Sequence, residues 1–507
     1  MTRICVPVCA RDFDRMREGV QRAADVADII ELRLDCLNEL ETAARYLAEL
    51  DGNAPPLILT LRSAEQGGHT SLDYSSRRRF WTALKVRDTD YFFDLEFDLV
   101  REFASAESSG PFELDWKRVI CSHHDFNGVP PDLEGIYEAM AATPARILKV
   151  AVQANDATDC LSIVKLLERS KSEGRELIAI AMGSAGMMTR VLGPSRGSFL
   201  TYGSLDDESG TAPGQITARQ LRDLYRIDSI NSQTQILGIL GNPVSQSLSP
   251  HIHNAAFASD GLNAVYLPFE VTDVNQFISR MVHPKTREWE WNVRGLSVTL
   301  PHKSSVMPYL DWIDPMANEI GAVNTIVAQD DRLLGYNTDG QGFIRPLWER
   351  FGSLQNTKCA VIGAGGGARA ALWALGNDGA NISLYARNAE RASLTARDFG
   401  VTCDRLANAD FAGFDVVVNA TPLGMSGENQ EMTPVSAAQL RGVRLAYDLV
   451  YNPIETAFLR EARAAGCDTL TGIEMLLAQA AEQFKLWTGK EPDSRVMRAS
   501  VLGGLNE

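Results

Sequence analysis

The sequence predicts an α/β protein made of two unlike halves, an N-terminal (β/α)8 TIM barrel followed by a two-lobed region with a Rossmann domain. Short apolar runs alternate with helical stretches from Ile4 to about Leu205. Most of these runs are continuously apolar, as expected for parallel strands buried on both faces. In the second half, an apolar strand at Cys359 leads into a Gly-rich turn and an Ala-rich helix. That order is the context of a dinucleotide-binding fingerprint.

The barrel is predicted from the number and spacing of the strands. Eight strand candidates follow one another with helical segments between them, and eight such units fit a (β/α)8 barrel. They are Ile4–Cys9, Ile29–Asp35, Leu57–Arg62, Tyr91–Phe97, Val119–Asp125, Ile147–Val152, Leu177–Gly183 and Leu200–Leu205.

Length and charge limit the possible functions. The chain has 507 residues, so two to four domains are expected. Its net charge of −16 argues against a nucleic-acid partner, because phosphate binding needs a basic surface. No apolar stretch approaches the ~20 residues of a membrane span, and a strand begins at Ile4, which leaves no room for a signal or transit peptide. We therefore expect a cytoplasmic protein without a nucleic-acid or membrane partner.

Cysteine and histidine spacing predicts no metal site. The eight cysteines form no C-x-x-C pair, so neither a zinc ribbon nor a disulfide framework is indicated. Several of them lie in apolar runs and fit small core positions. His251 and His253 could be mistaken for a metal-binding pair, but they follow Pro250 at a helix start and are expected to pack there.

Polar residues recur where the barrel strands end, on the rim where barrel enzymes keep their chemistry. Lys149 lies inside an apolar strand, where a charged amine is costly, so it either reaches the surface or serves as a nucleophile with a lowered pKa. His124 ends the previous strand and Arg190 follows the next one. An amine, a proton shuttle and a fixed cation suit a ketone substrate that also carries an anion.

The first half resembles the type I dehydroquinate dehydratase family across nearly its whole length. The resemblance rests on Glu31-Leu-Arg-Leu-Asp35, Thr60-Leu-Arg62, Ser122-His-His-Asp-Phe126, Lys149-Val-Ala151, Met182-Gly183 with Arg190, and Ala212-Pro-Gly-Gln215. It implies that Lys149 forms an imine with the ring ketone and that His124 removes the neighbouring proton and later helps water leave. It also implies a set of substrate-binding residues: Glu31, Arg33, Arg62, Arg190, Thr211 and Gln215. His123 should point away from this site, because neighbouring residues alternate along a strand.

One position departs from the family pattern. The family commonly has Glu before a Gly-Gly pair, where it supports the catalytic histidine, and this chain has Gln66. A neutral amide can orient an imidazole but cannot stabilise its cation. Either Glu65 takes the role through a shifted loop, or His124 works with a lower pKa.

A cofactor preference follows from the Gly-rich turn and the strand after it. An NAD site usually places Asp or Glu at the end of that strand, on the ribose 2′-hydroxyl. This chain has Arg387 there, after the strand Asn381–Tyr385. A guanidinium suits a 2′-phosphate, so NADP is the predicted cofactor. Just before this region, Lys303 and Asp339 could together donate a proton to a developing alkoxide while a hydride arrives.

The second half resembles the shikimate dehydrogenases over nearly its whole length. The motifs are Gly241 to Asn254, Ser297 to Lys303, Gly321-Ala-Val-Asn-Thr325, Asn337-Thr-Asp339, Gly363–Gly367, Asn419 to Met425, Tyr447 to Pro453, Met475 to Gln479, and Trp487-Thr-Gly489. The resemblance implies that Lys303 and Asp339 form the catalytic pair. The implied substrate-binding residues are Ser247, Ser249, Thr299, Asn324, Tyr451 and Gln479. The predicted cofactor-binding residues are Gly363, Ala364, Gly365, Gly366, Gly367, Ala368, Arg387, Asn388, Thr421 and Met425.

The expected organisation is a barrel over residues 1–226, a substrate-binding domain over 235–340 completed by 472–507, and an NADP-binding Rossmann domain over 341–471. A polar linker joins the halves. The two activities would act in sequence, from 3-dehydroquinate to 3-dehydroshikimate to shikimate. Two alternatives remain: a second half that acts on quinate, and a metabolite-binding regulator that has lost catalysis. The sequence does not give the oligomeric state.

Overall fold

The computed structural model describes residues 2–43, 46–47, 55–84, 91–105, 114–206, 209–212 and 214–505. Pro213, in one of the dehydratase-like motifs, lies outside them. The chain forms two compact units. The first comprises residues 1–235, 267–281 and 287–292, and the second comprises 236–266, 282–286 and 293–507.

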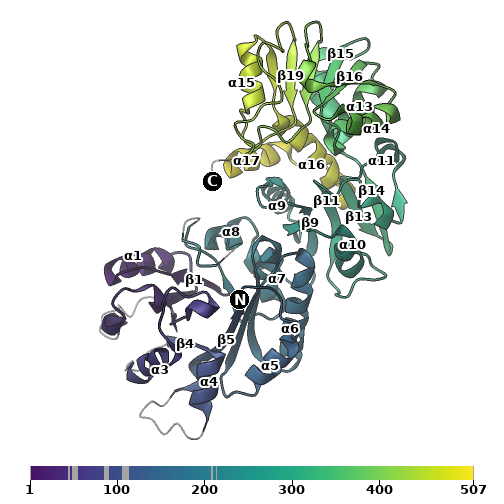
Figure 1. The fold of residues 1–507 in the computed structure, drawn as a ribbon. Coiled ribbons are helices and arrows are strands. Elements are labelled where there is room, and N and C mark those ends of the chain that lie inside the picture. Colours follow the sequence, from purple (N-terminus) through teal and green to yellow (C-terminus); the bar gives the residue numbers. More distant parts are fainter. Residues whose placement is uncertain are drawn as a thin grey trace. The chain divides into compact units, whose positions relative to one another are not determined.

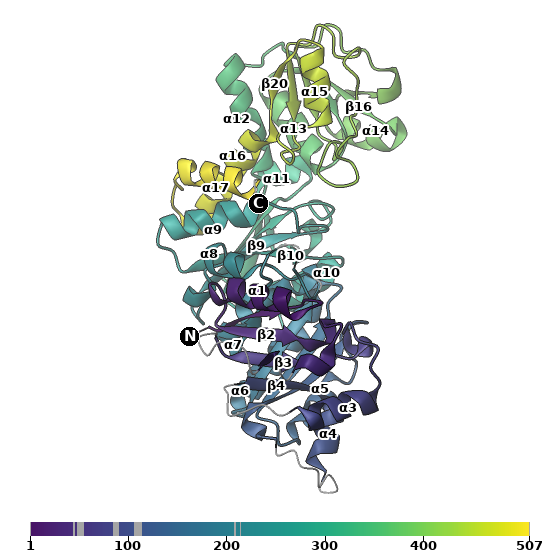
Figure 2. The ribbon, with the colours of Figure 1, turned by 90° about the vertical axis from the view of Figure 1, so that its left-hand side faces the viewer.

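The first unit is a nearly closed parallel barrel, as predicted. Its eight strands run in the order β7-β6-β5-β4-β3-β2-β1-β8, and Figure 2 shows β2, β3 and β4 side by side. A bridge between Leu177 and Ser198 joins β7 to the segment before β8. The strands are β1 (Ile4–Val8), β2 (Ile29–Arg33), β3 (Leu57–Thr60), β4 (Tyr91–Glu96), β5 (Val119–Asp125), β6 (Ile147–Gln153), β7 (Glu176–Met182) and β8 (Thr201–Tyr202).

Helices surround these strands (Figure 1). They are α1 (Phe13–Ala24), α3 (Tyr74–Ala83), α4 (Phe97–Ala104), α5 (Leu133–Ala141), α6 (Cys160–Ser172), α7 (Met187–Arg196) and α8 (Ala218–Asp223). Side chains cap several helix starts: Asp12, Asp73 and Asp132 accept backbone N–H groups of α1, α3 and α5. Apolar residues such as Cys5, Ile120 and Ile178 pack together in one core inside the barrel.

Most of a mixed sheet in the order β10-β9-β11-β13-β14-β12 belongs to the second unit. Its strands are β9 (Gln235–Gly241), β10 (Ala264–Glu270), β11 (Val293–Val298), β12 (Trp312–Ile313), β13 (Thr325–Gln329) and β14 (Arg332–Tyr336). The last two helices of the chain, α16 (Gly472–Thr488) and α17 (Ser494–Gly504), pack against α9 (Ser249–Ser259) and β9 in one core.

Between these segments lies a parallel sheet in the order β17-β16-β15-β18-β19-β20, the doubly wound arrangement predicted for a Rossmann fold. The strands are β15 (Lys358–Ile362), β16 (Asn381–Ala386), β17 (Thr402–Arg405), β18 (Val416–Asn419), β19 (Leu445–Asp448) and β20 (Asp468–Leu470). In Figure 1, helices α13 (Gly366–Asn377) and α14 (Ala389–Asp398) lie on the other side of the sheet from α15 (Ala457–Ala464). Helix α12 (Asp339–Phe351) joins the two sheets of the unit.

Among the described residues, none of the helices combines the length and the hydrophobicity needed to span a bilayer.

Candidate active sites

A cavity lies at the carboxyl ends of the barrel strands. All eight residues predicted for the first site line it: Glu31, Arg33, Arg62, His124, Lys149, Arg190, Thr211 and Gln215. Gln66 and Tyr202 also line it, whereas His123 does not. The structure therefore brings together side chains from strand ends that are far apart in the sequence.

Lys149 lies on β6 and is 5% exposed. Its Nζ donates to Oδ2 of Asp94 at 2.8 Å and to the hydroxyl of Tyr202 at 2.9 Å, and it is 3.4 Å from Oε1 of Glu31. Thr60 also donates to Glu31, at 2.7 Å. The lysine does not reach the surface. Its amine is held inside the cavity by acceptors from β2, β4 and β8.

His124 lies at the end of β5, between Arg62 and Gln66. Its Nδ1 is 3.1 Å from Nη1 of Arg62 and 3.3 Å from Oε1 of Gln66. The backbone N–H of His124 donates to the same Oε1 at 3.1 Å. Burial, together with the charges of Arg62 and Lys149, lowers the pKa of His124 well below its usual value. Glu65 is exposed and does not line the cavity, so it does not take the place of Gln66 beside His124.

Two arginines place positive charge in the cavity by different means. Arg190, on α7, is 1% exposed, and burial lowers its pKa to about 10. Arg33 makes two hydrogen bonds to Asp35, at 2.9 and 2.7 Å, and a third to the carbonyl of Gly67 at 3.4 Å. Asp35 also accepts the backbone N–H groups of Arg62 and His69. One carboxylate therefore fixes Arg33 and two neighbouring backbone segments.

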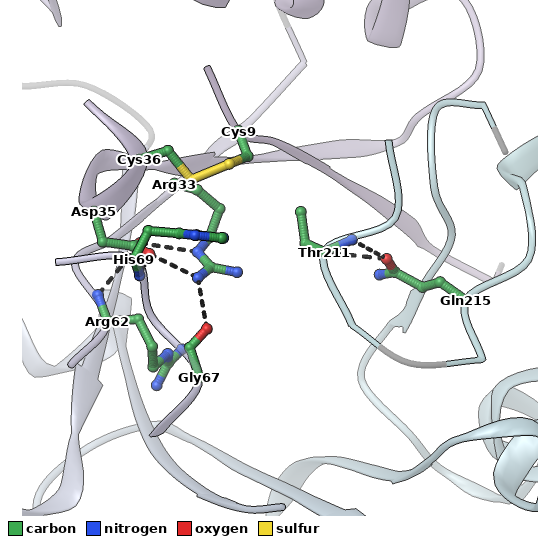
Figure 3. Close-up of a disulfide and its surroundings, with 9 residues drawn as sticks. All are labelled: Cys9, Arg33, Asp35, Cys36, Arg62, Gly67, His69, Thr211 and Gln215. Carbon is green, nitrogen blue, oxygen red and sulfur yellow. Dashed lines mark hydrogen bonds and ion pairs between the residues drawn. A yellow bond between two sulfur atoms is a disulfide. The ribbon is translucent and has the colours of Figure 1, made fainter. Parts of the chain in front are cut away.

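Thr211 and Gln215 lie on the loop after β8, where the backbone N–H of Thr211 donates to Oε1 of Gln215 at 2.8 Å. This bond leaves the amide nitrogen of Gln215 as a donor within the cavity lining. Both residues are drawn in Figure 3.

Sequence reasoning missed Asp94 and Tyr202. Asp94 is 1% exposed and accepts hydrogen bonds from both Lys149 and Arg62, which hold the pKa of its carboxyl below the usual range. The signal was present, because a carboxylate inside the apolar strand Tyr91–Glu96 needs a partner just as Lys149 does. Tyr202 carried no comparable signal, since a tyrosine in a strand is ordinary.

The structure corrects the prediction that no disulfide forms. Cys9 and Cys36 are joined, with Cα atoms 5.5 Å apart, next to Arg33 and Asp35 (Figure 3). They are 27 residues apart in the sequence, and no spacing pattern marks them. Their approach is a product of the fold, because β1 and β2 are parallel neighbours whose carboxyl ends lie at the same edge. Five of the six free cysteines are buried: Cys5, Cys121, Cys160, Cys359 and Cys467.

In the second unit, Lys303 and Asp339 are in direct contact. Nζ of Lys303 lies 2.6 Å from Oδ2 of Asp339, the first residue of α12. The side-chain amide of Asn324 donates to the other oxygen, Oδ1, at 2.8 Å, and also to Thr338 at 2.9 Å. Asn324 thus fixes the carboxylate that faces the lysine.

The predicted substrate-binding residues lie on α9 and α16 and on the loops after β9, β11 and β19, and Asn324 directly precedes β13. Ser249 begins α9 and is buried, and its N–H donates to Oγ of Ser247 at 3.2 Å. A hydrogen bond links Tyr451 to Ser247, and burial raises the pKa of Tyr451. Thr299 follows β11 and Gln479 lies on α16. Gln479 packs closely on α12: a Cβ added at Gly342 would lie 2.9 Å from the Cβ of Gln479.

The Gly-rich turn connects β15 to α13. Gly363 has φ +110°, and a Cβ there would lie 2.9 Å from the carbonyl oxygen of Ala420. A Cβ at Gly366, the first residue of α13, would lie 3.0 Å from Cδ of Lys303. Glycine at these two positions lets the turn approach the β18 loop and the lysine without displacing either. The start of α13 suits a pyrophosphate, because its N–H groups and dipole attract anions.

Arg387 and Asn388 follow β16 and are exposed. Asn388 caps α14 by accepting the N–H of Arg391 at 3.0 Å. Thr421 bonds to Asn419 at 2.7 Å at the end of β18, and Met425 on the same loop is 39% exposed. These residues and the Gly-rich turn all follow the carboxyl ends of β15, β16 and β18, where a dinucleotide binds in this fold.

His251 and His253 differ in environment. His253 is buried and stacks on Tyr266 with ring centroids 4.5 Å apart. Burial lowers its pKa to about 3. His253 therefore behaves as a neutral aromatic core residue.

Comparison with known proteins finds matches for both halves. Residues 4–232 match the family model of type I 3-dehydroquinase, residues 239–326 that of the shikimate dehydrogenase substrate binding domain, and residues 472–502 that of the shikimate 5'-dehydrogenase C-terminal domain. A chloroplastic bifunctional 3-dehydroquinate dehydratase/shikimate dehydrogenase of Arabidopsis thaliana is 34% identical and covers 96% of this chain and 82% of its own.

Two further relatives match the second half alone. The NADP(+) shikimate dehydrogenase of Methanococcus aeolicus is 38% identical over 54% of this chain and 99% of its own. A crystal structure of a shikimate dehydrogenase in complex with NADP+ is 38% identical, with a TM-score of 0.51 over 55% of this chain and 98% of its own.

Proposed function

Because this chain belongs to the family of bifunctional 3-dehydroquinate dehydratase/shikimate dehydrogenases, we propose that its two sites catalyse consecutive reactions on one metabolite. The barrel dehydrates 3-dehydroquinate to 3-dehydroshikimate, and the second unit reduces this ketone to shikimate with NADPH. The observation that carries the proposal is the buried Lys149, held in one cavity with His124 and Arg190.

In the barrel, the amine of Lys149 attacks the substrate ketone after its ammonium group gives up a proton. That proton departs in the water that leaves, which gives a protonated imine. The imine makes the neighbouring C–H acidic. His124 removes that proton as a base and returns it to the β-hydroxyl, which leaves as water. Hydrolysis of the imine then frees the lysine. Asp94, Glu31 and Tyr202 hold Nζ in place during this sequence.

The tautomer of His124 follows from its role as a base, which needs a lone pair on Nε2. Nδ1 then carries the proton and donates to Oε1 of Gln66, the closest oxygen acceptor at 3.3 Å. Arg62 can instead direct Nη1 at the hydroxyl of Ser122, 2.6 Å away. Gln66 therefore orients the base without adding a charge.

The substrate carboxylate and hydroxyls would bind to a second group of residues in the cavity lining. Arg190 is the candidate for the carboxylate, because a buried guanidinium gains most from an anion that replaces its lost hydration. Thr211 and Gln215 would bind beside it, and Glu31, Arg33 and Arg62 would position the ring.

In the second unit, Lys303 donates the proton that the developing alkoxide needs, and Asp339 keeps its ammonium oriented. Asn324 fixes the carboxylate and binds a ring hydroxyl together with Thr299 and Gln479. The substrate carboxylate would bind to a separate group of hydroxyls: Ser247, Ser249 and Tyr451.

The turn after β15 fits NADP, because Gly363 and Gly366 leave no room for side chains at the cradle. When bound, the nicotinamide supplies the hydride. The start of α13 would hold the pyrophosphate and Arg387 the 2′-phosphate, with Asn388 beside it. Thr421 and Met425 would line the cofactor. The remaining residues of this group form the turn itself: Ala364, Gly365, Gly367 and Ala368.

We also propose the domain boundaries expected from the sequence: 1–226 for the barrel, 235–340 with 472–507 for substrate binding, and 341–471 for NADP binding. The partners would be the small-molecule substrates alone, in the cytoplasm.

NADPH absorbance tests both activities in one cuvette. Wild-type protein should oxidise NADPH after addition of 3-dehydroquinate, and Lys149→Ala should not. The same variant should oxidise NADPH when 3-dehydroshikimate is added, which also shows that its second unit is folded. Oxidation with neither substrate in the wild type would contradict the proposal and favour a binding protein. Comparison of the rates of NADP+ reduction with quinate and with shikimate tests whether the second unit prefers quinate.

A further inference from the structure

Three possible metal ligands lie together at the rim of the barrel. Cys9 follows β1, Cys36 ends the short 3-10 helix after β2, and His69 lies on the loop after β3. One ligand atom of each lies within 4.8 Å of those of the other two. We propose that, when the disulfide is reduced, these residues bind a thiophilic divalent cation such as Zn²⁺, contrary to the expectation of no metal.

The distances allow this coordination. Zinc binds sulfur at about 2.3 Å and nitrogen at about 2.0 Å, so two thiolates in a tetrahedral site lie about 3.8 Å apart. The Cα atoms of Cys9 and Cys36 are 5.5 Å apart, a spacing at which rotation of the side chains can separate the sulfurs. His69 already lies within reach of both sulfurs. Three ligands from three successive strand ends would close around one ion.

The donor set selects the kind of ion. Thiolate sulfur and imidazole nitrogen favour Zn²⁺ over Mg²⁺ or Ca²⁺, which prefer oxygen. Two thiolates also neutralise the charge of a divalent cation. Cys9 and His69 are exposed, so the ion can enter from solvent and a water can complete a tetrahedral site.

Asp35 holds two of the ligands in position. It directly precedes Cys36, and its Oδ2 accepts the backbone N–H of His69 at 3.0 Å. Its other contacts, to Arg33 and the N–H of Arg62, anchor it to β2 and β3. Groups that fix the backbone around metal ligands reduce the entropy lost on binding, and their removal commonly weakens metal affinity. The site is therefore organised before an ion arrives (Figure 3).

Disulfide and metal exclude each other, because only the thiolate binds zinc. Reduction by a dithiol or a phosphine transfers two electrons and gives the two thiols of Cys9 and Cys36. Binding of Zn²⁺ then displaces both thiol protons. The oxidised protein should have no affinity at this site, and oxidation of the loaded site should release the ion.

Cobalt(II) provides a spectroscopic test that is independent of enzyme activity. The full chain without a histidine tag is reduced with a phosphine, desalted under anaerobic conditions and titrated with Co²⁺. We expect one Co²⁺ per chain, a thiolate-to-cobalt charge-transfer band, and displacement by Zn²⁺. Cys9→Ser and Cys36→Ser should abolish the band, and His69→Gln should weaken binding by about 10- to 100-fold. Cys403→Ser, at a partly exposed free cysteine in the second unit, should match the wild type.

Circular dichroism and thermal unfolding establish that each variant is folded. Three outcomes would overturn the proposal: no charge-transfer band in the reduced wild type, an unchanged band in Cys9→Ser, or equal binding by the oxidised protein. The first outcome would mean that Cys9 and Cys36 serve only as a disulfide. The second would mean that the cobalt binds at adventitious sites.

Discussion

The ammonium group of Lys149 and one guanidinium nitrogen of Arg62 both donate to the same oxygen of Asp94, each at 2.8 Å. Asp94 is buried, so this oxygen is the common acceptor for two buried cations. Removing a charge from such a group costs more than the loss of one hydrogen bond, because the partners remain buried and uncompensated.

Replacement of Asp94 by Asn should therefore impair dehydration. We expect kcat to fall by about 10- to 100-fold, since the reactive amine loses its fixed position. Borohydride trapping of the substrate adduct should fall in parallel. Asp98→Asn, at a half-exposed carboxylate on α4, is the matched control. Wild-type kcat in a folded Asp94→Asn protein would remove Asp94 from the site.

Gln66→Glu should change the pH dependence of dehydration. A carboxylate 3.3 Å from Nδ1 stabilises the imidazolium and raises the pKa of His124, which burial now holds low. The base must be neutral to act. The acid limb of the pH profile of kcat/KM should therefore move to higher pH by about 1 pH unit. Glu65→Gln, one residue away and exposed, should leave the profile unchanged. Identical profiles for Gln66→Glu and wild type would contradict this explanation.

Lys303→Ala should affect only the second activity. Loss of a positioned proton donor lowers kcat for 3-dehydroshikimate reduction by about 10²- to 10⁴-fold. Dehydration of 3-dehydroquinate, followed in the same preparation, should keep its wild-type rate and so reports that the barrel is folded. Lys490→Ala, at an exposed lysine, serves as the control. Equal losses in both activities would point to a general folding defect.

Arg387→Ala should weaken the preference for NADPH over NADH. A charged contact to phosphate contributes about 1.5–3 kcal/mol, so kcat/KM for NADPH should fall by about 10- to 150-fold. The value for NADH should change little, because NADH has no 2′-phosphate. Arg441→Ala, at an exposed arginine before β19, is the comparison. A uniform loss with both cofactors would place Arg387 elsewhere in the site.

Asp448 should make the stability of the second unit depend on pH. Burial raises the pKa of this carboxyl to about 7, although Asn419 and Thr456 donate to it. The carboxyl of Asp448 ionises near pH 4 in the unfolded chain and near pH 7 in the folded protein. The contribution of Asp448 to the free energy of unfolding is therefore fully present below pH 4. It is lost as pH rises to 7, by up to about 1.4 kcal/mol per pH unit.

Asp448→Asn should remove this dependence. The melting temperature of the variant relative to wild type should increase from pH 5 to pH 7 and then level off. A difference that is constant across this range would show that the carboxyl titrates at its ordinary pKa.

The sequence predicted the fold well because apolar runs locate buried parallel strands. Each of the eight barrel strands appears where it was expected, within a few residues. The largest difference is the last one, predicted as Leu200–Leu205 and observed as Thr201–Tyr202. A bridge between Ser204 and Thr217 replaces ladder pairing there, so the local apolar pattern overstated the length of the strand.

The site was predictable where one residue carried an unusual cost, as Lys149 does inside its strand. Tyr202 and the Cys9–Cys36 pair were not, because their roles arise only when the barrel brings distant strand ends together. Asp94 could have been found by the argument used for Lys149. The effect of Gln66 needed coordinates, since the choice between it and Glu65 depends on which side chain faces His124.

The approach of Gly366 to Lys303 has a consequence for redesign of the enzyme. A methyl group on that glycine would lie 3.0 Å from Cδ of Lys303, so a substitution at Gly366 also shifts the side chain of the lysine. Arg387, which is predicted to bind at the ribose end of the cofactor, is exposed, so a substitution there meets no such crowding. We therefore expect that cofactor preference can evolve, or be engineered, from the ribose end, whereas a larger residue at Gly366 requires Lys303 to shift.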